Sequence, residues 1–204
     1  GEGDAGAWIF IGIKIGLGGN GDDDCRINGV LEITRYLCRM KDLLSKDEKK
    51  VKSALKRADK SGTIAWVEPL LEAFSLRNDD ALKDEMRALL SSVKLSAAEG
   101  VFLETLNNQE RKDIHADVLG FMWSAGFVPS ESVDVIVRCA TSGDYRSAME
   151  GLTLVEQCEV VEDEQILLEA ILTLRNALDC KEKSEVHALY KPMLEALIYL
   201  ERNQ

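Results

Sequence analysis

Apolar residues recur at helical spacing along the chain from Ile27 onward. In the stretch DEKKVKSALKRADK (47–60), the apolar residues Val51, Ala54, Leu55 and Ala58 fall at i, i+3, i+4 and i+7, which is one stripe of a helix. No stretch after residue 30 alternates cleanly between apolar and polar residues at period two. The pattern therefore predicts an all-α protein with about ten helices, most of roughly 10 to 18 residues, joined by short turns.

Capping and turn residues indicate where these helices begin and end. Ser45 with Glu48, and Ser96 with Glu99, have the spacing of a capping box at a helix N-terminus. Turn-type residues at further predicted helix ends are Asn78-Asp79, Pro129-Ser130, Gly62, Gly126 and Gly143.

Four apolar pentads repeat along the chain at nearly constant spacing. They are LLEAF at 70–74, FLETL at 102–106, VIVRC at 135–139 and LLEAI at 167–171, separated by steps of 32, 33 and 32 residues. The second helix of the unit also repeats at a step of 32, because Leu82, Met86, Leu89, Leu90 and Val93 match Ile114, Val118, Phe121, Met122 and Ala125. Such repetition of helix pairs is typical of an α-solenoid. The alternative is a non-repetitive bundle whose helices happen to have similar lengths.

One unit resembles the HEAT and armadillo group of helical repeats. The segment WVEPLLEAFSLRNDDALKDEMRALLSSV (66–93) has a proline, Pro69, near the start of its first helix, an Asn/Asp turn, and acidic residues opening its second helix. The tetratricopeptide and ankyrin patterns are absent. The stretches FMWSAGF (121–127) and GDYRSAMEGLTLVE (143–156) are most similar to an uncharacterised bacterial family of HEAT-like proteins of about this length. The resemblance covers roughly residues 45 to 200 and implies a short α-α superhelix, but it brings no activity or binding residues.

The first residues differ from the rest, and residues 1–26 are predicted to be a non-helical arm preceding a HEAT-like domain at 27–204. The segment WIFIGIKIGLGGNGDDD (8–24) has the Gly16-x-Gly18-x-x-Gly21 spacing of a dinucleotide loop. The aspartates that follow would repel phosphates, and neither a second strand nor a complete calcium loop is present. We expect the apolar arm to dock on the helical body or to pair with the same segment of a second chain, forming a homodimer.

Composition narrows the function classes. The formal net charge of −11 argues against a nucleic-acid binder, because phosphates repel an acidic surface. No run approaches the roughly 18 apolar residues that span a bilayer, so no membrane association is expected. The five cysteines form no C-x-x-C motif, which argues against a disulfide framework or a zinc site and favours the cytoplasm.

No constellation of catalytic, cofactor-binding or metal-binding residues is found in the sequence. His115 and His187 lack a recognisable nucleophile, the acids at 159–164 suit a helix N-terminus, and the lysines at 46–60 suit a solvated helix face. We therefore expect a non-catalytic scaffold that binds a protein partner on the inner face formed by the second helices. The candidate contact residues there are Lys83, Arg87, Asp117, Trp123 and Arg146. The alternative is a small-ligand-binding or hydrolytic protein that uses a groove between repeats, with His115 or the acidic cluster in it.

Overall fold

The computed structural model describes residues 23–180 and 185–203, and within these ranges all regular structure is helical. The α-helices are α1 (Asp23–Leu43), α2 (Glu48–Ser61), α3 (Val67–Leu76), α4 (Asp80–Ser91), α5 (Ala98–Asn107), α6 (His115–Ala125), α7 (Val133–Ser142), α8 (Tyr145–Val155), α9 (Glu164–Asp179) and α10 (His187–Asn203). Three 3₁₀ segments, η1 (Ile64–Trp66), η2 (Gln109–Ile114) and η3 (Ser130–Ser132), precede α3, α6 and α7. No helix in the described ranges has the length and apolar character needed to cross a membrane.

The chain divides into two compact units, Gly1–Thr34 and Arg35–Gln204. Residues 1–22 lie outside the described residues, and with them most of the predicted arm and its expected docking or pairing. Helix α1 begins at Asp23, so the last four residues of the predicted arm, 23–26, are helical. The repeat array belongs to the second unit.

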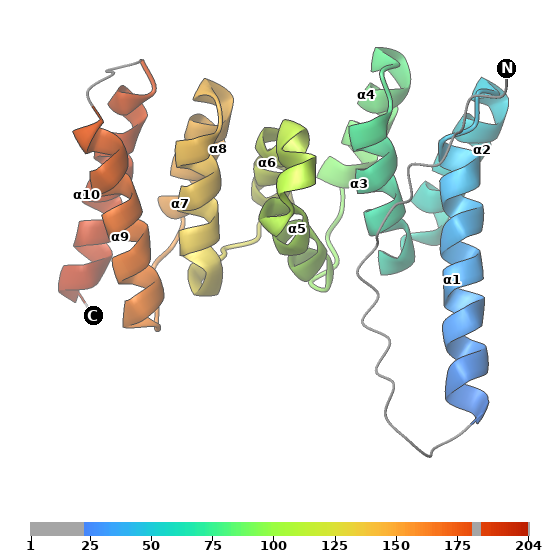
Figure 1. The fold of residues 1–204 in the computed structure, drawn as a ribbon, viewed down its shortest axis with the longest axis horizontal. Helices are drawn as coiled ribbons and strands as arrows, with labels where there is room; N and C mark the ends of the chain where they lie inside the picture. Colours follow the sequence, from blue (N-terminus) through green and yellow to red (C-terminus); the bar gives the residue numbers. More distant parts are fainter. Residues whose placement is uncertain (1–22, 181–184, 204) are drawn as a thin grey trace, which may run out of the picture. The chain divides into compact units, whose positions relative to one another are not determined.

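The second unit is a two-layered array of helix pairs, as the repeat spacing predicts (Figure 1). The first helices α3, α5, α7 and α9 pack on one another in chain order and form one layer. The second helices α2, α4, α6, α8 and α10 pack in the same order and form the other layer. The fold is thus an all-α solenoid of the α-α superhelix class rather than an irregular bundle.

All four pentads lie in the first-helix layer and face the same core. Leu71, Phe102, Ile136 and Ile171, one from each pentad, are each at most 1% exposed. Their neighbours along each helix join a single cluster of buried residues that runs from Leu43 to Leu200. Because each pentad contributes residues to this cluster, the repeats share one continuous apolar seam.

Aromatic rings join successive pairs at the centre of this seam. The ring of Phe121 on α6 lies edge-on to Phe74 on α3, with 5.8 Å between the ring centroids. Phe102 on α5 lies 6.2 Å from Phe121 and 6.0 Å from Phe127, again between centroids. These contacts connect the α3–α4 pair to the α5–α6 pair through side chains that bury large apolar areas.

The predicted glycine caps are present, whereas both predicted capping boxes are wrong. Gly62 and Gly126 end α2 and α6 with φ of 56° and 78°, a left-handed conformation that glycine adopts without strain. Helix α2 is capped by Asp47, whose carboxylate accepts from the Lys49 N–H at 3.0 Å, and not by Ser45.

At α5 the predicted cap Ser96 makes no capping bond, because a backbone turn already binds the amide groups there. The N–H of Ala98 donates to the Leu95 carbonyl at 2.9 Å, and that of Glu99 donates to the Ser96 carbonyl at 3.2 Å. A side-chain acceptor therefore has no free donor to serve.

The described cysteines are free thiols in two environments. Cys139 and Cys158 are buried, whereas Cys38 and Cys180 are exposed. Burial raises the pKa of the Cys139 thiol to about 11, so this group stays protonated and unreactive at neutral pH. Two of these four cysteines thus serve as small apolar residues of the core.

Candidate functional site

Three of the predicted contact residues join in one ion-pair network across three neighbouring helices. Asp117 on α6 accepts from Arg87 Nε on α4 at 3.2 Å and from Arg146 Nη2 on α8 at 2.9 Å, both at its Oδ1 atom. The Asp117 residue is only 8% exposed, whereas the arginine side chains are 39% and 46% exposed. One largely buried carboxylate therefore fixes two surface guanidinium groups.

The repeat explains why these residues meet. Arg87, Asp117 and Arg146 are about one repeat apart in sequence, so stacking brings them side by side on parallel second helices. Asp117 also lies in the first turn of α6, where the helix dipole favours a negative charge. The carboxylate thus has local as well as inter-repeat stabilisation.

The network continues at both of its ends. On α8, Arg146 Nε lies 3.9 Å from Glu150 Oε1. Burial raises the pKa of Glu150, and repulsion by Asp117 adds to this rise, whereas the charge of Arg146 opposes it. On α4, Arg87 also pairs with Asp84. Lys83 Nζ and the Arg87 guanidinium lie 4.7 Å and 5.2 Å from the centroid of the Phe74 ring. These cation–π contacts hold both cations over the core.

Large apolar side chains are exposed on two of the helices that carry the network. Trp123 on α6 is 48% exposed, and Tyr145 and Met149 on α8 are 50% and 44% exposed. On α6 the positions one and two turns before Trp123 carry the small, half-buried residues Gly120 and Ala116. Among the other aromatic residues, Trp66 and Tyr190 are buried in the core, whereas Tyr199 is exposed.

We call this region of α4, α6 and α8 the second-helix surface. It comprises Lys83, Arg87, Asp117, Trp123, Tyr145, Arg146, Met149 and Glu150. Five of these are the candidates chosen from the sequence, and the structure adds Tyr145, Met149 and Glu150 from α8. Helix α8 buries one stripe, which includes Ala148, Gly151 and Val155. Tyr145, Met149 and Glu150 could have been found in the sequence because they lie on the opposite face of this helix.

Removal of the Asp117 carboxylate gives a direct measure of the network. Asp117→Ala should lower the free energy of unfolding by about 1–3 kcal/mol, because two guanidinium groups lose their shared acceptor. The matched control is Asp84→Ala, which removes a partner of Arg87 whose side chain is 70% exposed. This change should lower the free energy of unfolding by less than about 0.5 kcal/mol. Urea denaturation of both variants measures the difference, and equal costs would contradict a central role for Asp117.

The contacts described for the two histidines are with backbone carbonyls and with an aromatic ring. His115 is buried, and its Nε2 atom lies 3.2 Å from the Thr105 carbonyl oxygen and 3.1 Å from that of Asn108. The ring therefore connects the start of α6 to the end of α5. The His187 ring packs 5.6 Å from the Tyr190 ring, between centroids. Neither contact brings a side-chain nucleophile to an imidazole.

Two carboxylates of the first-helix layer, Glu72 and Asp163, have structural partners. Glu72 on α3, only 6% exposed, accepts from the Tyr36 hydroxyl and lies 3.5 Å from Arg111 Nη2. In the acidic stretch at 159–164, Asp163 caps α9 by accepting from the N–H groups of Gln165 and Ile166. Over the described part of the chain, no group of three or more potential ligands is arranged to hold a metal ion.

Glu68 beside this cluster has a raised pKa, mainly through burial, with Arg111 opposing and Glu72 and Glu104 adding to the shift. Because the pKa is raised, the folded protein binds this proton more tightly than the unfolded chain does. The resulting stabilisation is complete below the ordinary pKa of 4.5 and is lost as the pH rises through the folded-state pKa. Glu68→Gln should therefore stabilise the protein near pH 7 relative to the wild type, and the gain should shrink near pH 4. Urea denaturation at both pH values measures it.

The control for this pH dependence has the opposite sign. Hydrogen bonds from the N–H and hydroxyl of Ser147 lower the pKa of Asp144, the cap of α8, below its ordinary value of 3.8. Its stabilisation is present above that value and is lost as the pH falls. Asp144→Asn should thus destabilise near pH 7 and lose its effect in acid. If the Glu68→Gln gain grew in acid, burial would not be its cause.

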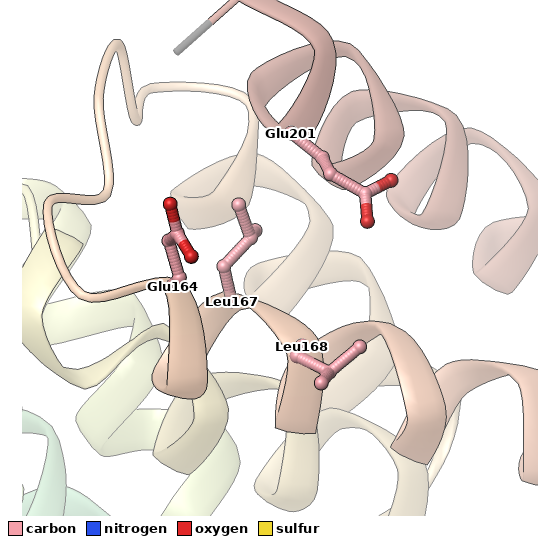
Figure 2. Close-up of a pocket in the computed structure, with 4 residues that line it drawn as sticks. All are labelled: Glu164, Leu167, Leu168 and Glu201. Carbon is pink, nitrogen blue, oxygen red and sulfur yellow. The ribbon is translucent and has the colours of Figure 1, made fainter.

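His115, the predicted catalytic candidate, lines neither of the two cavities described next. One, of about 320 Å³, lies between α9 and α10 and is lined by Glu164, Leu167, Leu168 and Glu201 (Figure 2). The other, of about 330 Å³, lies between the ends of α2 and α4 and the start of α3. It is lined by Ala58, Asp59, Gly62, Thr63, Trp66, Val67, Leu70, Leu89, Ser92, Val93, Lys94 and Leu95. No histidine or cysteine lines either cavity.

Comparisons of the chain with protein-family models, with curated proteins and with solved structures gave no match. The resemblance to HEAT-like proteins therefore remains a prediction, whereas the helical-repeat architecture rests on the structure itself.

Proposed function

We propose that the protein is a non-catalytic interaction module that binds a protein partner on its second-helix surface. The observation that carries the proposal is the exposure of Trp123, Tyr145 and Met149 on α6 and α8, two of the helices that carry the Arg87–Asp117–Arg146 network. Tryptophan, tyrosine and arginine dominate the binding energy of protein interfaces, and methionine is also enriched there. This surface therefore combines the residue types that bind proteins most strongly.

The geometry also lowers the cost of binding. Asp117 holds both arginines in place, and Gly120 leaves room for Glu150, whose Oε1 would lie 3.3 Å from a Cβ added at that glycine. Side chains that are already fixed lose little conformational entropy when a partner binds. Parallel second helices further present one extended surface, which is how repeat proteins bind partners.

Net charge and thiol chemistry support a protein as the partner and the cytoplasm as the compartment. The net charge of −11 disfavours nucleic acid as the partner. Free thiols at the four described cysteines suit the reducing cytoplasm, where we place the protein.

Affinity capture tests the proposal with matched variants. The wild-type chain, the triple variant Trp123→Ala/Tyr145→Ala/Met149→Ala, and the control Leu76→Ala are each used as bait in extracts of the source cells. Leu76 is 55% exposed at the end of α3, outside the second-helix surface. The wild type and Leu76→Ala should recover the same specific proteins, and the triple variant should lose them. Identical recoveries by all three baits, or no specific protein with any, would contradict the proposal.

The alternative is a small-ligand-binding protein that uses the inter-repeat groove, and the cavity between α2, α3 and α4 favours it. Its lining is mostly apolar, with Asp59 and Lys94 as charged members, which suits a small apolar molecule with one polar end. Leu89→Trp should fill the cavity. Under this alternative, a small apolar compound that raises the melting temperature of the wild type would leave the melting temperature of Leu89→Trp unchanged.

A further inference from the structure

The outward side of α9 carries an exposed stripe that no described helix covers. Glu164, Leu168, Leu172 and Arg175 are all exposed and fall at i, i+4, i+8 and i+11, along one side of the helix. Leu168 and Leu172 are 43% and 46% exposed. Two neighbouring leucines thus form the middle of the stripe, with one charge of each sign at its ends.

The repeat shows what this stripe would normally contact. At the repeat spacing, Leu168 corresponds to Leu71 on α3, Leu103 on α5 and Ile136 on α7. Leu71 and Ile136 are fully buried, and Leu103 is partly buried. Helices α3, α5 and α7 each pack against the next first helix. Leu168 therefore occupies a position that buries its side chain when another helix stacks on it.

We propose that a second copy of this chain covers the stripe, with the two α9 helices packed antiparallel about a two-fold axis. In that register Leu168 packs against the partner's Leu172, and Leu172 packs against the partner's Leu168. Glu164 then lies opposite the partner's Arg175, and the same ion pair forms again at the other end of the stripe. The stripe is thus complementary to itself, as a two-fold interface requires.

The cavity between α9 and α10 fits this arrangement. It is lined by Leu167 and Leu168 and by the carboxylates of Glu164 and Glu201, and it lies beside the N-terminal half of α9 (Figure 2). An antiparallel second helix brings its C-terminal half to this place. The partner's Leu172 would enter the cavity, and the partner's Arg175 would lie between two carboxylates.

Charge selects this orientation over a parallel one. Parallel packing of the same two stripes would place Glu164 against its own copy and Arg175 against its own copy, and like charges in contact are unfavourable. Antiparallel packing replaces both repulsions with attractions. The second-helix surface on α4, α6 and α8 carries none of these residues, so the dimer and the proposed partner binding are independent.

Sedimentation equilibrium on the full 204-residue chain tests the dimer, with a monomer mass of 22.6 kDa as reference. The wild type should approach twice this mass as its concentration rises and should not grow beyond it. Leu168→Asp should remain monomeric. The control Leu76→Asp, which places the same charge at another exposed leucine, should dimerise like the wild type.

A charge swap provides the second arm of the test and does not depend on the leucines. Glu164→Arg and Arg175→Glu should each raise the dimer dissociation constant about ten-fold or more, because two ion pairs per dimer become repulsions. The double variant Glu164→Arg/Arg175→Glu should recover most of the lost affinity.

Several results would overturn the proposal. These are a wild-type chain that stays monomeric, a mass that grows beyond the dimer, a dimer that survives Leu168→Asp (as one held by residues 1–22 would), and a double variant weaker than both single variants. Circular dichroism of each variant confirms that it is folded.

Discussion

Phe121→Ala is expected to lower the free energy of unfolding by about 3–5 kcal/mol. Phe121 is 2% exposed on α6, and its ring contacts Phe74 on α3 and Phe102 on α5. Truncation removes a large apolar area and leaves a cavity where two helix pairs meet. The surrounding backbone belongs to three packed helices and cannot collapse fully into that space.

The matched control for this variant is on the same helix. Trp123→Ala removes a larger side chain two residues later, but the Trp123 side chain is half exposed and should contribute less than about 1 kcal/mol. Urea denaturation of both variants, with the midpoint and slope compared, measures the two costs. If the two costs were similar, the aromatic contacts of Phe121 would not join the two pairs as described.

The same substitution at two helical glycines should have opposite effects. Gly151→Ala on α8 should destabilise the protein by about 1–3 kcal/mol, because overpacking forces two helices apart. A Cβ atom added at Gly151 would lie 2.6 Å from the Ala140 Cβ on α7, far inside van der Waals contact. Helices α7 and α8 therefore cross at a distance that only glycine permits.

Gly100→Ala on α5 is the control for this pair. Nothing lies within 4 Å of a Cβ at Gly100, so alanine should stabilise the helix by about 0.5–1 kcal/mol through its better helix propensity. Thermal unfolding of both variants should show melting temperatures on opposite sides of the wild type. A stabilised Gly151→Ala variant would mean that α7 and α8 are not in close contact there.

The array could be predicted from the sequence because one physical requirement repeats. Each first helix must bury an apolar face, so the pentads recur at 32 or 33 residues and each contributes buried residues to the shared core. Cap residues with a single strong conformational preference, such as Gly62 and Gly126, were also predicted correctly. The same spacing occurs in four units, so together they give stronger evidence for the fold than any single segment does.

The sequence did not predict which of several neighbouring groups caps a helix N-terminus. Ser45 and Asp47 both have side chains able to cap α2, and only the path of the chain decides that Asp47 does so. The backbone turn before α5 similarly replaces the cap that Ser96 could provide. These choices depend on backbone geometry that a spacing rule does not contain.

The candidate surface was predicted as separate positions, not as a network. Arg87, Asp117 and Arg146 were chosen because they lie off the apolar stripe, and this says nothing about their mutual distances. Asp117 is nearly buried because α4 and α8 flank α6 on both sides, which a helical pattern on α6 alone cannot show. Contacts between repeats require the three-dimensional register.

Photo-cross-linking tests the central claim, that a partner binds the second-helix surface, most directly. A benzoylphenylalanine replaces Trp123 in one protein and Leu76, on the end of α3, in another, and both are irradiated in extracts of the source cells. A specific partner should cross-link from position 123 and not from position 76. Cross-linking of that partner from position 76 alone, or equally from both, would contradict the account.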